Sequence, residues 1–194
     1  FFKTAFDKLV ALFLLIISAP ILLLLKIAYV IEGWLIPENA GPMFFYYWGI
    51  SAGKQIPKYK IRLIKQKYIE PEGAKRHDWI AYSAEWTPNS RTYVGQFVKK
   101  FYLDELPQFW IVLKGDMSIV GPRPERQFFI DQIVLKAPHY RHLHKVRPGI
   151  TSWGQIKYGY AENIEQMVER MKFDILYIEN MSIAMDFKIV FYTI

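Results

Sequence analysis

The sequence lacks several patterns that identify common enzyme classes. It contains no cysteine, which excludes disulfide bonds and thiolate metal sites. Neither a Rossmann glycine fingerprint nor a P-loop is present, so a nucleotide would be bound through a metal and basic side chains. The histidines match no HExxH-like pattern. A solvated or phosphate-facing role is therefore favoured over a zinc site for His77, His139, His142 and His144.

Long apolar runs are also scarce, since only one is present, from Leu9 to Leu25, and this disfavours a polytopic membrane enzyme. The residues in it that are not strongly apolar are Ser18, Ala19 and Pro20. The run is at the short limit for a bilayer span, which needs about 20 residues. No convincing signal-peptide cleavage site is present, so the run predicts a permanent membrane anchor.

Pro20 predicts a kink in this anchor, because proline removes one backbone donor and clashes with the preceding turn. Ser18 is available to satisfy the carbonyls that the kink would free. Lysines flank both ends of the run, so the charge pattern does not assign its ends to opposite sides of a membrane. The residues alone leave open a re-entrant or deeply interfacial helix and a kinked helix that spans the bilayer.

The composition is apolar and basic. At 194 residues the chain can build a hydrophobic core, with 52% hydrophobic and 17% aromatic residues. Its net charge is +7 and its pI is about 9.4. This combination suits a protein that lies on an anionic membrane face and handles anionic substrates, although the charge alone would also suit nucleic acid.

The most informative stretch is LDELPQFWIVLKGDMSIVGPRPE, from Leu103 to Glu125. Two adjacent carboxylates, Asp104 and Glu105, precede a proline that predicts the first turn of a helix, and Gly115 predicts its end. Carboxylates at such a place can simply cap backbone N–H groups. However, Arg123 follows between Pro122 and Pro124, in a stiff turn that suits a bidentate grip on phosphate. Acids that can hold a hard cation, close to a rigid arginine, make phosphoryl transfer a hypothesis.

The middle of the chain predicts a hairpin, with a strand over residues 43–48 and a turn at Gly53. Basic and apolar residues alternate from Tyr59 to Lys65, which would place Lys60 and Arg62 on one face of a strand. That face is either solvated or a basic wall for phosphates. The polar segment from Gln66 to Ser90 predicts a surface loop that could form part of a substrate lid. A helical stripe that predicts core or interface packing follows at Val94, Phe97, Val98 and Phe101.

The C-terminal part predicts three helices. The first extends from Phe128 to Lys136, the second carries an apolar stripe from Ile164 to Ile178, and the third, capped by Ser182, is apolar enough to lie on a membrane face. Between the first two, Arg147 precedes a Pro-Gly turn. By itself this arginine could either bind phosphate or neutralise an acid.

Several of these segments resemble one family. LDELPQ, GDMSIVGPRPE, and RPGIT with the Trp-Gly-Gln at Trp153 to Gln155 resemble the bacterial sugar transferases, the monotopic polyprenyl-phosphate phosphoglycosyl (sugar-1-phosphate) transferases. The resemblance extends from Lys3 to Ile194. The chain departs from the family pattern at Leu63 and Ile64, and it has Tyr47, Trp48, Gly49 and Ile50 where the family commonly has Gln and Arg before Val-Gly.

The fold expected from the patterns and the resemblance is α+β and mostly helical, with a small β-hairpin or sheet and amphipathic interfacial helices. The resemblance implies a re-entrant membrane helix within residues 1–32, broken at the motif that contains Ser18 and Pro20. It also implies a catalytic domain over residues 33–194 on the cytoplasmic face of the bacterial inner membrane. The RPGIT match favours phosphate binding by Arg147.

The activity implied by the resemblance is transfer of a sugar-1-phosphate from a nucleoside-diphosphate sugar, with a UDP-sugar as the expected donor, to undecaprenyl (polyprenyl) phosphate. This step initiates synthesis of a glycoconjugate, exopolysaccharide, capsule or O-antigen. Asp104 would be the nucleophile of a phosphosugar-aspartyl intermediate, and Glu105 would bind Mg²⁺ (or Mn²⁺) with Asp104 or manage a proton. The expected phosphate-binding residues are Lys60, Arg62, Arg123 and Arg147.

The expected partners are therefore the lipid phosphate, the nucleotide sugar and the membrane, without nucleic acid and with a homodimer left open. The alternative is a non-catalytic membrane-surface anchoring or binding protein with a degenerate transferase site.

Overall fold

The computed structural model describes residues 2–69 and 88–193. Most of the predicted lid loop lies outside these ranges. Its two ends form short 3-10 helices, η2 (Gln66–Tyr68) and η3 (Pro88–Ser90). The chain forms two compact units: unit 1 comprises Phe1–Ala11, Gly49–Ile56 and Val112–Ile194, and unit 2 comprises Leu12–Trp48 and Pro57–Ile111.

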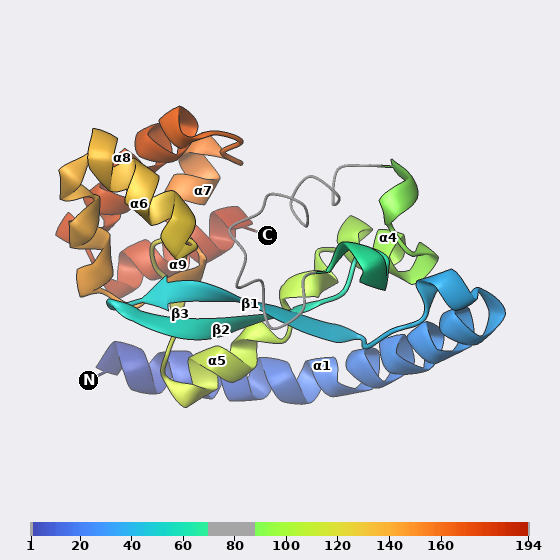
Figure 1. Cartoon of the computed structure of the whole chain (residues 1–194). Coiled ribbons are helices and arrows are strands. Elements are labelled where there is room, and N and C mark those ends of the chain that lie inside the picture. Colours follow the sequence, from blue (N-terminus) through green and yellow to red (C-terminus); the bar gives the residue numbers. More distant parts are fainter. Residues whose placement is uncertain (1, 70–87, 194) are drawn as a thin grey trace. The chain divides into compact units, whose positions relative to one another are not determined.

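The predicted membrane segment is one helix, α1 (Phe2–Leu35), drawn in blue in Figure 1. It is long and apolar enough to cross a membrane, and only 17% of its most apolar window is buried. The helix continues through the Ser18 to Pro20 motif, with Pro20 inside it, and the kink expected there stays a prediction. The Ser18 hydroxyl donates to the Leu15 carbonyl at 3.1 Å, which keeps this side chain within the helical turn. A re-entrant course in a membrane, and a domain boundary after residue 32, stay predictions.

Unit 2 contains most of the hairpin formed by β1 (Phe44–Ser51) and β2 (Lys54–Ile61), which lie side by side in Figure 1. The predicted turn is confirmed, because Ala52 and Gly53 connect the strands with φ values of 46° and 77°. A further 3-10 helix, η1 (Pro37–Asn39), follows α1. The core of unit 2 joins α1, the end of β2 and the next helix through Leu25, Tyr29, Met43, Ile61, Leu63, Ile64 and Val98.

At the start of the next helix, α4 (Tyr93–Lys100), two side chains accept hydrogen bonds from its first main-chain N–H groups. The Thr92 hydroxyl caps it by accepting from the Gly95 N–H at 2.9 Å. The buried Glu32 carboxylate of α1 accepts from the main-chain N–H groups of Tyr93 at 2.6 Å and Val94 at 3.0 Å. These bonds fix the end of α1 to the start of α4.

The apolar stripe predicted on α4 is only partly a core stripe. Val98 is completely buried, whereas about half of Phe97 and of Phe101 is exposed. The two phenylalanine rings contact one another, with their centroids 4.8 Å apart. Helical spacing identified the face correctly, but it could not show that part of this face remains uncovered.

The chain then forms η4 (Leu103–Glu105), which the sequence analysis did not anticipate, and α5 (Gln108–Lys114), the helix that Pro107 and Gly115 predicted. Gly115 ends α5 with a φ of 97°, a value that favours glycine. In unit 1, β3 (Ser118–Val120) pairs in parallel with β4 (Gly149–Thr151), in the register Ser118↔Gly149. The sequence analysis did not anticipate this second two-stranded sheet.

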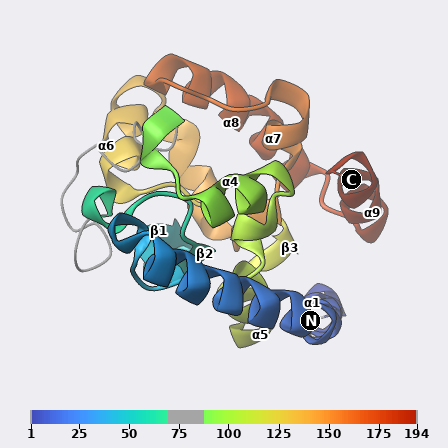
Figure 2. The same cartoon turned by 90° about the vertical axis from the view of Figure 1, so that its right-hand side faces the viewer.

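The remainder of unit 1 after β3, apart from β4, is mainly helical. Its elements are α6 (Gln127–Lys136), η5 (Pro138–Lys145), α7 (Trp153–Tyr158), α8 (Ile164–Glu179) and α9 (Ile183–Thr193). The three predicted C-terminal helices are thereby confirmed, and the Ser182 hydroxyl accepts from the Met185 N–H at the start of α9. Figure 2 shows α7 folded back against α8, and a core cluster of Val120, Trp153, Tyr177 and Ile189 joins β3 to these helices. The fold is α+β and mostly helical, as expected.

Candidate active site

The two predicted catalytic acids lie together with one predicted phosphate-binding lysine in unit 2. The Lys60 ammonium is 3.0 Å from Asp104 Oδ2 and 3.2 Å from Glu105 Oε1. Asp104 is 1% exposed and Lys60 is 7% exposed, whereas Glu105 is half-buried. One cation therefore serves two adjacent carboxylates, and the buried position of Asp104 strengthens its attraction to the ammonium.

Local backbone geometry explains why the acids are adjacent. Tyr102 takes a left-handed conformation with φ 53°, which redirects the chain after α4. A single 3-10 turn then carries both acids, and the Leu106 N–H closes it on the Leu103 carbonyl at 3.2 Å. Lys60 reaches them from β2, which is separated from this turn by more than 40 residues along the chain.

Gln108, from the motif LDELPQ, is a buried polar residue to which the sequence analysis gave no role. It is 0% exposed and lies at the first position of α5, one turn after Asp104. Among residues 2–69 and 88–193, neither its amide nitrogen nor its amide oxygen has a hydrogen-bond partner. Buried polar groups in this condition are uncommon, and they mark candidate functional positions.

Arg62 is buried, so the solvated strand face considered for Lys60 and Arg62 is wrong for both residues. The Arg62 guanidinium donates to three main-chain carbonyls in unit 2, those of Asn39 at 2.7 Å, Pro42 at 2.9 Å and Ile64 at 3.0 Å. These contacts hold the segment that follows α1. They indicate a structural role for Arg62, and its predicted role in phosphate binding stays a prediction.

Arg123 belongs to unit 1, where it lies in the PRPE turn (residues 122–125). Its guanidinium donates to Gln155 Oε1 at 3.2 Å. The turn is fixed at both ends by main-chain bonds, from the Gly149 N–H to the Pro122 carbonyl at 2.9 Å and from the Ile50 N–H to the Glu125 carbonyl at 3.0 Å. The stiffness predicted from the flanking prolines is thus increased by strand neighbours.

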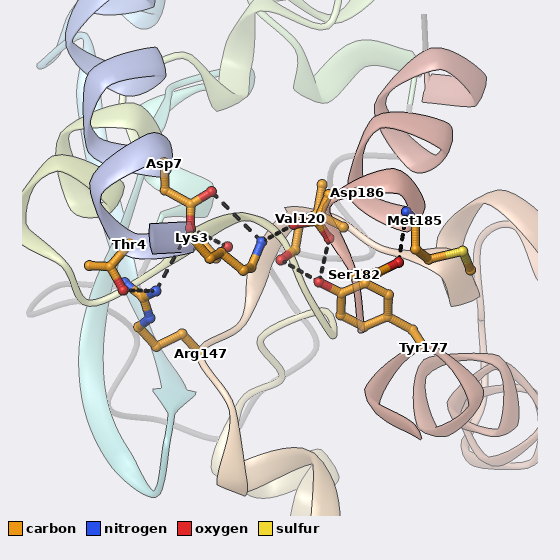
Figure 3. Close-up of polar contacts among 10 residues, drawn as sticks. Lys3, Thr4, Asp7, Val120, Arg147, Tyr177, Ser182, Met185 and Asp186 are labelled. Carbon is orange, nitrogen blue, oxygen red and sulfur yellow. Dashed lines mark hydrogen bonds and ion pairs between the residues drawn. The ribbon is translucent and has the colours of Figure 1, made fainter. Parts of the chain in front are cut away.

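Arg147 also lies in unit 1, and its nearest polar partners come from the start of α1 (Figure 3). It donates to the Thr4 hydroxyl at 2.8 Å, and its guanidinium is 3.8 Å from the buried Asp7 carboxylate. The sequence alone left two roles open for Arg147, phosphate binding and neutralisation of an acid. These contacts are those of a residue that neutralises an acid, Asp7. The phosphate-binding role favoured by the resemblance stays a prediction.

The same cluster extends to α8 and α9. The Lys3 ammonium is 2.5 Å from Asp186, and the Tyr177 hydroxyl donates to the other oxygen of that carboxylate at 2.7 Å. Figure 3 shows Lys3 and Asp7 extending from α1 toward Asp186 on α9. Burial raises the pKa of Tyr177, and its bond to Asp186 acts in the same direction, so this hydroxyl remains a donor at neutral pH.

The donor chemistry at Asp104 and Glu105 fits the expected Mg²⁺ (or Mn²⁺). Carboxylate oxygens are hard ligands, and Mg²⁺ is usually held by one or two of them together with water and substrate phosphates. Among the described residues, no group of three or more His, Asp or Glu side chains could form a metal site. The acid pair could therefore supply only part of a coordination sphere, as is usual for a metal that arrives with a phosphorylated substrate.

Comparison with known proteins identifies the family. The family model for bacterial sugar transferases matches residues 1–194. The chain belongs to this family. The bacterial sugar transferase motifs quoted from the sequence are thus those that carry Asp104 and Glu105, the PRPE turn and the Arg147 segment, while Lys60 lies on β2, outside them.

Individual relatives cover nearly all of this bacterial sugar transferase chain. The chain is 35% identical over 195 residues to the UDP-N-acetylgalactosamine-undecaprenyl-phosphate N-acetylgalactosaminephosphotransferase of Aeromonas hydrophila. This match covers 100% of this chain and 43% of that protein. It is also 35% identical to the UDP-glucose:undecaprenyl-phosphate glucose-1-phosphate transferase of Escherichia coli, over 99% of this chain and 39% of the relative. A protein of the same name from Caulobacter vibrioides is 32% identical over 99% of this chain and 68% of its own length. The chain thus spans about two fifths of the first two relatives.

Proposed function

We propose that the chain transfers a sugar-1-phosphate from a nucleoside-diphosphate sugar, specifically a UDP-sugar, to undecaprenyl phosphate at the bacterial inner membrane. The observation that carries this proposal is the buried pair of Asp104 with Lys60, with Glu105 beside it, in a chain of the bacterial sugar transferase family. Relatives named as undecaprenyl-phosphate sugar phosphotransferases support the acceptor and the reaction class.

In the first step an oxygen of Asp104 attacks the phosphorus that bears the sugar. The bond from this phosphorus to the bridging oxygen breaks, and the nucleoside monophosphate leaves with that bond's electron pair. In the second step a phosphate oxygen of the lipid attacks the same phosphorus, and the Asp104 carboxylate is released unchanged. Both steps use one carboxylate, which predicts ping-pong kinetics.

The residues around Asp104 explain how it can act. Lys60 keeps a positive charge beside the carboxylate and can move toward the phosphate oxygens as negative charge accumulates there. Glu105 is more exposed than Asp104 and shares the same lysine, so it can hold a proton or a metal at the edge of the site. Burial of Asp104 limits the access of water, which would otherwise hydrolyse the aspartyl intermediate.

The expected Mg²⁺ would be held by Asp104 and Glu105, and when bound it would offset the negative charge of the pyrophosphate. The apolar face of α1 supports location at a membrane, where the lipid phosphate resides. A catalytic domain on the cytoplasmic side belongs to the same proposal.

The test is release of nucleoside monophosphate by the detergent-solubilised chain mixed with Mg²⁺, undecaprenyl phosphate and a panel of UDP-sugars. We expect release with at least one sugar and loss of release in Asp104→Asn, because an amide is a poor nucleophile. Asp131→Asn is the matched control: it makes the same change at an exposed aspartate outside the quoted motifs, and activity should persist.

Two outcomes would contradict the proposal. Full turnover by Asp104→Asn would eliminate the aspartyl intermediate. A folded wild-type chain that releases no nucleotide with any donor in the panel would instead favour a non-catalytic anchoring or binding protein at the membrane surface.

A further inference from the structure

Two buried charged residues on α8 hold the PRPE turn from one side. Arg170 and Asp174 are 6% and 2% exposed, and they are one helical turn apart. Arg170 forms a hydrogen-bonded ion pair with the Glu125 carboxylate, at the end of the turn. A sequence analysis based on the apolar stripe of α8 gave no role to either residue.

The Asp174 carboxylate binds the main chain at the start of α7, where it accepts from the Gly154 N–H at 2.8 Å. Burial is the main cause that raises the pKa of Asp174, to about 6, against the opposing effects of the Gly154 N–H, the Arg170 charge, the Ser152 hydroxyl and the main-chain N–H of Arg123. The group is therefore mainly ionised at neutral pH and acts as an acceptor. The main chain of the PRPE turn at Arg123 also faces this carboxylate.

A side-chain contact joins the PRPE turn to the start of α7. Arg123 donates through its guanidinium to Gln155, and Gln155 directly follows Gly154. By binding the main chain at Gly154, Asp174 sets the place of Gln155, the residue that Arg123 contacts. The fit is close, since a Cβ atom added to Gly154 would lie 2.8 Å from Asp174 Oδ2 and 2.7 Å from the Arg170 carbonyl oxygen.

We infer that Asp174 is a positioning residue that holds the start of α7, and with it Gln155, so that Arg123 is kept in the orientation in which it grips a substrate phosphate. The inference rests on the function proposed above and on the phosphate-binding role that the sequence predicts for Arg123. Burying a carboxylate costs desolvation free energy, whereas an apolar side chain of similar size would pack there without the need for hydrogen-bond partners. The presence of Asp174 between the PRPE turn and α7 is explained if orientation, and not stability alone, depends on it.

The first experiment tests positioning without any assay of activity. Hydrogen exchange in detergent would be compared for the wild-type chain, Asp174→Asn and Asp131→Asn, a control on α6 whose exposed carboxylate accepts from Gln127. Asparagine keeps the shape but replaces one acceptor oxygen with a donor. We expect at least a tenfold faster exchange in peptides that contain residues 123 and 154 in Asp174→Asn, and no change there in the control. Unchanged exchange at both places would overturn the positioning role.

The second experiment tests whether the positioning matters for the substrate. In Asp174→Asn, KM for the sugar donor should rise by between about tenfold and a hundredfold, because small misplacements of a binding group cost this much. In an Arg123→Ala background the same substitution should leave KM unchanged. An equal rise of KM in both backgrounds would show that Asp174 acts on the fold as a whole and would overturn the inference. The proposed function would still stand in that case, provided that the unmutated chain turns over substrate.

A wild-type chain without turnover is a different result. It would count against the proposed function and, with it, against the phosphate role of Arg123. Faster exchange at residues 123 and 154 would still establish that Asp174 holds the two segments. The two failures are therefore distinguishable.

Discussion

The contact between Lys60 and the two acids makes a quantitative prediction. Lys60→Met keeps the apolar stem of the side chain but removes the ammonium that lies 3.0 Å from Asp104 and 3.2 Å from Glu105. The side chains of Lys60 and Asp104 are 8% and 2% exposed, so solvent cannot replace the lost cation. Breaking a buried ion pair by removing one partner costs about 3–5 kcal/mol, and we expect the free energy of unfolding to fall by this amount.

The assay is denaturant unfolding in detergent, followed by tryptophan fluorescence, with the transition midpoint and slope fitted separately. Lys65→Met is the matched control, because Lys65 pairs with a glutamate, Glu38, that is largely exposed, at 2.7 Å. Exposed ion pairs contribute little, so the control should unfold close to the wild type. The double variant Lys60→Met with Asp104→Asn should be less destabilised than the sum of the single variants, because the second change removes the unpaired charge.

The reasoning would be refuted if Lys60→Met destabilised the protein no more than Lys65→Met does. It would also be refuted if the effects of Lys60→Met and Asp104→Asn were simply additive. Either result would mean that water or another cation reaches Asp104, and that the acid pair does not depend on Lys60.

Two further predictions concern the elements that hold the site. Ala52→Asn should raise the free energy of unfolding by about 0.5–1 kcal/mol, because Ala52 has a φ of 46° and asparagine tolerates the left-handed region; a decrease in the same denaturation assay would contradict this. Glu32→Gln should lower the free energy of unfolding by about 1.5–3 kcal/mol, because the carboxylate accepts from two main-chain N–H groups of α4 and from Asn39. Hydrogen exchange should then accelerate first at residues 93 and 94, and an unchanged rate there would refute the capping role.

The sequence predicted well those helices and turns that are specified by residues close together in the chain. Proline, glycine and the apolar period located α5, α6, α8 and the hairpin turn, because these residues restrict the backbone wherever they occur. The parallel pair of β3 and β4 could not be found in this way. Each strand has only three residues, and their pairing depends on contact between segments about 30 residues apart.

The candidate site likewise contains residues that the sequence identified and contacts that it could not predict. The motif around Asp104 identified the acids, and the alternation in β2 identified Lys60, but their contact is a tertiary one that no sequence period encodes. Alternation treated Lys60 and Arg62 alike, yet one meets carboxylates and the other meets main-chain carbonyls. Lys60 lies within β2, which ends at Ile61, whereas Arg62 follows the strand and donates to the segment after α1 at Asn39 and Pro42.

Asp174 and Glu32 were missed because each lies in a helix whose apolar face dominated the analysis. A signal was nevertheless present, since a carboxylate within an apolar period must be paired if the helix is buried. Asp174 is three residues after Met171 in the stripe of α8, and Glu32 lies near the end of the long apolar helix. Acids at such positions are candidates for caps and for anchors of neighbouring loops.

The buried charges also limit what the basic character of the chain can mean. Among the described residues, the buried ionisable acids and bases are equal in number: Asp7, Glu32, Asp104 and Asp174 against Lys58, Lys60, Arg62 and Arg170. The net charge of +7 is therefore carried by the remaining residues. Salt screens exposed charges strongly and buried pairs weakly. Attraction to an anionic membrane face must then depend on ionic strength, while the pairing of Lys60 with Asp104 and of Arg170 with Glu125 must depend on it much less.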